Sequence, residues 1–103
     1  MKIIERLSEK IGEEIHDAKC YTKMALEYRE DYPDVARTVY NISLEEMEHM
    51  GRLHGAVVNL IADYRKEHGE PPADMLAVYE YLHKQQIEKA AEVKTLQAMY
   101  KES

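Results

Sequence analysis

The sequence contains no phenylalanine or tryptophan, only one cysteine, four glycines and three prolines in 103 residues. The lone Cys20 excludes an internal disulfide, and with no second cysteine it forms neither a zinc knuckle nor a redox pair. No segment approaches the roughly 20 apolar residues of a membrane span, and the charged N-terminal segment has no apolar run typical of a signal peptide. These absences predict a soluble cytoplasmic protein.

Basic residues are also fewer than acidic ones. Fourteen Lys and Arg against twenty Asp and Glu give a net charge of −6, with a pI near 5.3. Nucleic-acid binders usually present a basic stripe, so we expect no nucleic-acid partner and consider cations better ligands. The length predicts a single domain over residues 1–103, whose small core gains stability from metal or self-association.

Helix-breaking residues occur in only two short segments, residues 31–34 and 68–74. They predict an all-α chain with helices at about 2–30, 35–67 and 74–101, in which an antiparallel hairpin is followed by a long third helix. Gly69, followed by two prolines, indicates a helix stop. Asp34 and Asp74 stand where N-caps are expected.

Apolar residues recur at steps of three and four, the period of an amphipathic helix. The first stripe comprises Ile4, Leu7, Ile11, Glu14, Ala18, Tyr21, Ala25 and Tyr28. The second comprises Val35, Val39, Ile42, Glu46, His49, Leu53, Ala56 and Leu60. The third is less regular, with Leu76, Tyr79, His83, Ile87, Ala90, Val93, Leu96 and Tyr100 as the expected buried edge.

Glu14, Glu46 and His49 interrupt the middle of the first two stripes. A carboxylate buried alone costs several kcal/mol, so something must compensate it. Counted from the turn between the two helices, Glu14 lies at roughly 27 Å and the Glu46-x-x-His49 pair at roughly 20 to 25 Å, within about one turn of each other. Glu-x-x-His is the spacing by which helical bundles hold paired iron or manganese ions. The pattern predicts a metal site, against the alternative of a hydrogen-bonded Glu-His pair that fixes register.

The number of ligands predicts the assembly. A four-helix di-metal site uses four Glu and two His, whereas one chain supplies two Glu and one His. We therefore expect a homodimer, or a larger even-numbered oligomer, whose two-fold axis completes the site and the four-helix core. Two carboxylates and an imidazole suit a divalent transition metal, and spacing alone does not separate iron from manganese or zinc.

Other acidic and histidine residues fit the site less well. Glu80 and His83 repeat the Glu-x-x-His spacing, but the count from the second turn places them more than about 10 Å from the height of His49. Glu88 and Glu92 lie closer to that height, with an ordinary solvated face as the alternative. Tyr21, two turns after Glu14, is the tyrosine placed to meet an oxidising metal centre.

The segments Glu13-Glu14 with Tyr21, residues 40–49 and residues 72–82 resemble the ferritin-like superfamily, and most closely the encapsulated ferritin family. The resemblance covers roughly residues 5–84. It implies that Glu14 and Glu46 ligate or bridge two irons shared between subunits, that His49 is a terminal ligand, and that Tyr21 lies beside the site. Glu13 and His16 take outer positions where the family carries carboxylates, so His16 is a departure.

The resemblance implies an iron-storing or detoxifying ferroxidase. Residues 97–103 lack the Gly- and Leu-rich tail of a cargo protein, so we do not expect docking into an encapsulin shell. One alternative is a rubrerythrin-like peroxide reductase, although the chain has no rubredoxin-type cysteines. The other is a metal-free helical scaffold, in which Glu and His only set dimer register.

Overall fold

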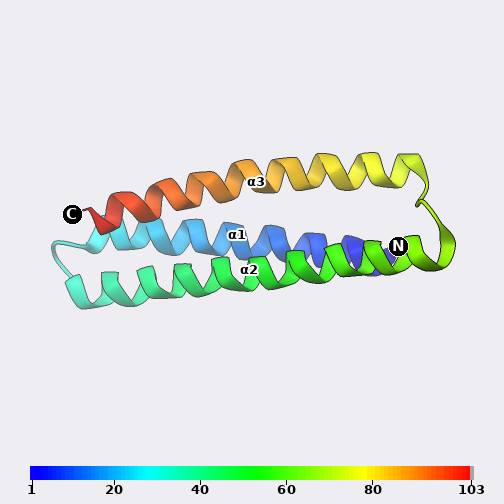
Figure 1. Ribbon diagram of the computed structural model, residues 1–103. Coiled ribbons are helices and arrows are strands. Elements are labelled where there is room, and N and C mark those ends of the chain that lie inside the picture. The colour runs from blue at the N-terminus through cyan, green and yellow to red at the C-terminus, as the bar shows by residue number, and fades with distance from the viewer. Residues whose placement is uncertain (103) are drawn as a thin grey trace.

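A computed structural model describes residues 1–102, which form three long helices and no strand: α1 (Lys2–Tyr28), α2 (Pro33–His68) and α3 (Ala73–Lys101). Consecutive helices run antiparallel in a rod of 56 × 19 × 18 Å, with the two termini at opposite ends (Figure 1). No helix within residues 1–102 is long and apolar enough to cross a membrane. The all-helical prediction of a hairpin plus a third long helix is confirmed. A four-helix core needs a second chain and stays a prediction.

The helix boundaries differ from the predicted ones by at most two residues. α2 begins at Pro33 because the fixed φ and missing N–H of proline suit the first helical position. Asp34 and Asp74 are not N-caps as predicted; the caps are Tyr32 and Pro72, and the two aspartates lie in the first turn, where their charge favours the helix dipole. Gly69 ends α2 with a φ of 79°, as the helix-stop prediction required.

The middle helix of the packing is α1, which contacts both α2 and α3 along its length, whereas α2 and α3 meet at few places. Its buried side chains are Ile4, Ser8, Ile11, Ile15, Ala18, Thr22 and Ala25. The predicted stripe is therefore wrong in part: Leu7, Glu14 and Tyr21 are only half-buried and Tyr28 is exposed. The core face of α1 is turned toward Ser8, Ile15 and Thr22 because this helix has to face two neighbours rather than one.

Both polar contacts and apolar burial hold the third helix against the other two. Ala90 and Val93 are buried as predicted, but Ile87 is 55 % exposed and Gln97 is buried in place of its neighbour Leu96. The side chain of Gln97 donates a hydrogen bond of 3.1 Å to Ser43 Oγ on α2. Two ring contacts add to this: His54 stacks on His83 at 4.6 Å, and Tyr40 lies against Tyr100 at 4.4 Å.

Candidate metal centre

Glu14, Glu46 and His49 meet at the middle of the α1–α2 hairpin. Each residue offers one ligand atom, and the three atoms lie within 4.8 Å of one another. The short connection between Tyr28 and Pro33 brings the two helices back along each other, so that residues at matching distances from the turn face one another. The predicted match in height is confirmed. Within residues 1–102 this is the one His, Cys, Asp and Glu group with metal-ligand spacing.

The three side chains differ in their access to solvent. The Glu14 side chain is 24 % exposed, yet its Oε2 atom is buried and makes no hydrogen bond within the described chain. His49 Nδ1 lies 3.7 Å from that oxygen, beyond hydrogen-bond distance, and the His49 side chain is 50 % exposed. A buried carboxylate oxygen without a partner is costly, and the exposed imidazole leaves one side of the group open.

Electrostatics couple the two carboxylates. The pKa of Glu46 rises from 4.5 to about 7, first because its protonated side chain hydrogen-bonds Glu14, then because of desolvation and the negative charges of Glu14 and Asp17. The charge of His49 lowers the pKa of Glu46. When both carboxylates are ionised neither one donates, so the hydrogen bond between them exists only while one proton is shared.

The donor set suits a divalent transition metal. Two carboxylate oxygens and an imidazole nitrogen within 4.8 Å are the ligand types that bind iron, manganese and zinc. The unpaired Glu14 Oε2 is the kind of buried polar atom that a cation satisfies, and the raised pKa of Glu46 shows that the surroundings of this carboxylate favour added positive charge. The residues present therefore fit such an ion.

A partly covered apolar surface surrounds the group, and some of its side chains also pack against the core. Side chains at helical spacing from the three ligands continue it along both helices; we call this surface the open face. Its members are half-buried or exposed: Leu7, Tyr21 and Tyr28 on α1, and Val35, Ile42, Leu53, Ala56 and Leu60 on α2.

The third helix leaves the open face uncovered. On α1, α3 reaches Ser8 through Gln86 and Lys19 through Glu92. Both contact points lie roughly 120–140° around the helix from Glu14 at 100° per residue. The two faces of α1 are therefore separate, and α3 does not shield the metal-ligand group.

The remaining predicted candidates lie outside the group. Tyr21 is half-buried and packs toward the turn, against Ala25, Ala36 and Val39. Glu80 and His83 do not join the ligands, in agreement with their predicted height, since His83 stacks on His54. Glu88 and Glu92 do not join either, and Glu92 pairs with Lys19 at 2.8 Å.

Asp17 also acts on the group, although sequence reasoning did not single it out. Its negative charge helps to raise the pKa of Glu46. The sequence spacing could have predicted this, because Asp17 follows Glu14 by three residues and so lies on the same side of α1. Farther round the helix, Glu13 pairs with Lys10 at 3.1 Å, and His16 Nε2 lies 3.6 Å from Cys20 Sγ.

Comparison with known protein families, with curated proteins and with solved structures gives no match. The geometry of the group and the chemistry of its residues therefore carry the functional interpretation.

Proposed function

We propose that this chain is a ferritin-like ferroxidase, close to the encapsulated ferritins, that oxidises Fe(II) at a site shared by two copies and serves iron storage or detoxification in the cytoplasm. The observation that carries the proposal is the buried, unpartnered Glu14 Oε2 beside Glu46 and His49. A scaffold needs no such oxygen, whereas a metal ion satisfies it.

A second copy supplies what one chain lacks. Two Glu and one His from each of two chains related by a two-fold axis make four Glu and two His, the set that carboxylate-bridged di-metal bundles use. The open face supports this arrangement, because its apolar side chains flank the ligands on both helices and are covered only in part, or not at all, in the single chain. Joining two open faces encloses the ligands between four helices.

Iron acts here as the substrate, and side chains of the protein supply its ligands. Glu14 and Glu46 would hold Fe(II), and His49 would complete the ligand set while leaving room for the oxidant. When bound, the iron supplies the redox chemistry, since each Fe(II) gives up one electron to O₂ or peroxide. The proton shared by the carboxylates leaves Glu46 as the cation enters, because the pKa of this group is about 7 in the metal-free chain.

The test is Fe(II) oxidation at neutral pH, followed by Fe(III) absorbance, with matched variants. Glu46→Gln and His49→Ala remove ligands, whereas Glu45→Gln and His68→Ala change exposed residues of the same types on the same helix, outside the ligand group. We expect at least tenfold slower oxidation in the first pair and wild-type rates in the second. Equal rates in all four variants would contradict the proposal.

Two further readouts separate the alternatives. Turnover of peroxide without accumulation of Fe(III) would favour the peroxide reductase. A chain that binds no metal but still dimerises would favour the scaffold, in which the Glu-His pair only fixes register.

A further inference from the structure

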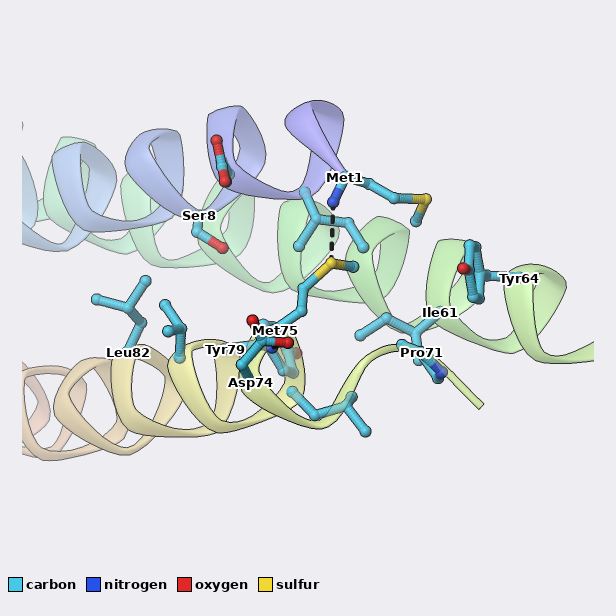
Figure 2. Close-up of a pocket in the computed structure, with 13 residues that line it drawn as sticks. Met1, Ser8, Ile61, Tyr64, Pro71, Asp74, Met75, Tyr79 and Leu82 are labelled. Atoms are coloured by element: carbon cyan, nitrogen blue, oxygen red, sulfur yellow. Dashed lines mark hydrogen bonds between the residues drawn. The ribbon is translucent and has the colours of Figure 1, made fainter. Parts of the chain in front are cut away.

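A cavity of about 290 Å³ lies at the end of the rod where α2 turns into α3. Figure 2 shows Ile61 and Tyr64 reaching it from α2, Pro71 from the connection, and Tyr79 and Leu82 from α3. The start of α1 closes the third side. The cavity lies between the start of α1, the end of α2 and the start of α3, and α2 and α3 have few contacts with each other along their length.

The walls of the cavity are mostly apolar. The apolar lining residues are Met1, Ile4, Ile61, Pro71, Met75, Leu76, Val78 and Leu82. A second cavity of about 430 Å³ continues along the α1–α3 interface and shares Glu5, Ser8, Val78 and Leu82 with the first. The two spaces therefore meet at Ser8 and form one elongated groove, a shape that suits a chain-like ligand rather than a compact one.

The side-chain hydroxyl of Ser8 lies at this junction and has no hydrogen-bond partner in the described part of the protein. Its residue is 7 % exposed, and its carbonyl oxygen accepts a hydrogen bond of 3.0 Å from Gln86. Within residues 1–102 the Ser8 hydroxyl makes no hydrogen bond, although Thr22 on the same helix face bonds its own backbone. Figure 2 shows the hydroxyl pointing into the space between α1 and α3. The hydroxyl oxygen is open to the cavity and bonds no group of the described chain, so a ligand in the cavity can pair with it and gain affinity.

The charged lining argues against an anionic ligand. The charged side chains of the first cavity are the carboxylates of Glu5 and Asp74. The amino group of Met1 also lies there, but it contacts Met75 Sδ at 3.2 Å. Glu9 and Lys89 line the second cavity, so the whole groove has three carboxylates against one lysine and the Met1 amino group, and this net negative charge disfavours a carboxylate head group. A neutral head group meets no such repulsion.

We propose that the groove binds a neutral aliphatic molecule with one hydroxyl-type head group, its chain among the apolar walls and its head on Ser8. An apolar cavity of about 150 Å³ accommodates benzene, so a volume near 290 Å³ suits roughly 8–12 carbon atoms. Ser8 and Glu14 lie on different faces of α1, so this ligand site is separate from the proposed iron site.

The test uses 1-octanol as the probe and sodium octanoate as its anionic counterpart, titrated into the metal-free protein in EDTA and followed by amide NMR shifts. Without metal, the result does not depend on the proposed ferroxidase function. Val78→Trp fills the groove, whereas Ile87→Trp adds the same ring at another exposed position of α3 outside both cavities. Ser8→Ala removes the hydroxyl, and circular dichroism checks that each variant stays helical.

We expect saturable binding of one octanol per chain and at least tenfold weaker binding of octanoate. Val78→Trp is expected to abolish octanol binding and Ile87→Trp to leave it unchanged. Ser8→Ala is expected to weaken it about three- to tenfold, the usual range for one lost hydrogen bond. Non-saturable binding would overturn the proposal, as would equal effects of the two tryptophans, an unaffected Ser8→Ala, or equal affinity for both probes.

Discussion

His49 Nδ1 lies 3.7 Å from Glu14 Oε2 across the α1–α2 interface, a separation too long for a hydrogen bond and short enough for both atoms to bind one ion. The oxygen is buried and unpartnered, and the imidazole is half exposed. The arrangement therefore combines an electrostatic cost within the single chain with an open route to the ligands. The first two predictions below depend on this cost.

The metal-free chain should lose part of its stability as the pH rises from 4.5 to 7. The pKa of Glu46 is raised to about 7 by the hydrogen bond to Glu14, so the folded state binds more protons than the unfolded state between these values. Its contribution is complete below pH 4.5 and is lost as the pH passes 7. Thermal unfolding in EDTA should show this loss of stability with rising pH in wild type and in Glu45→Gln but not in Glu46→Gln. The same slope in Glu46→Gln would be inconsistent with this origin.

Replacement of Glu14 by Leu should stabilise the metal-free chain while abolishing iron binding. Above pH 7 the change removes a buried oxygen without a partner, which is worth about 1 kcal/mol in the free energy of unfolding. Urea unfolding measures the gain. The matched control Glu13→Leu changes a 61 % exposed carboxylate and should shift stability by less than about 0.5 kcal/mol. A Glu14→Leu variant that is less stable, or that still binds iron, would count against the proposed site.

Ile42→Gln should weaken dimerisation without unfolding the chain. Ile42 is half-buried, precedes Glu46 by one helical turn, and belongs to neither core cluster. A two-fold dimer buries it twice, so the apolar loss should raise the dimer dissociation constant at least tenfold. Analytical ultracentrifugation checks this against Leu44→Gln, a 42 % exposed leucine on another face of α2. Equal effects of the two changes would show that the open face is not the dimer surface.

Replacing each of two glycines by alanine should change the stability of the protein in opposite directions. Gly69 caps α2 at a φ of 79°, a conformation that strains an alanine, so Gly69→Ala should cost about 1 kcal/mol. Gly51 lies inside α2 with nothing within 4 Å of an added Cβ, so Gly51→Ala should stabilise by about 1 kcal/mol. Chemical denaturation of the two variants measures both values. Changes of the same sign would contradict this account of the α2 end.

The sequence predicted the parts of the fold that depend on local chemistry. Gly69 and the two prolines that follow it marked the end of α2, and the count from the first turn brought Glu14 to the height of Glu46 and His49. Both follow from backbone preferences and from a fixed rise per residue.

The features that the sequence did not predict depend on the third helix. Its side chains lack a clear apolar stripe, so periodicity could not show that Gln97 rather than Leu96 is buried. For the same reason, the shift of the α1 core toward Ser8 and the cavity at Ser8 were not foreseen. The raised pKa of Glu46 likewise depends on side-chain distances that a sequence does not contain.

The most direct test of the shared iron site measures bound iron and native mass together, after anaerobic Fe(II) loading at neutral pH. The account predicts about one iron per chain in an even-numbered oligomer, with both the iron and the iron-linked assembly lost in a Glu46→Ala, His49→Ala double variant. A monomer that binds two irons tightly, or a wild-type chain that binds none and assembles like the double variant, would contradict it.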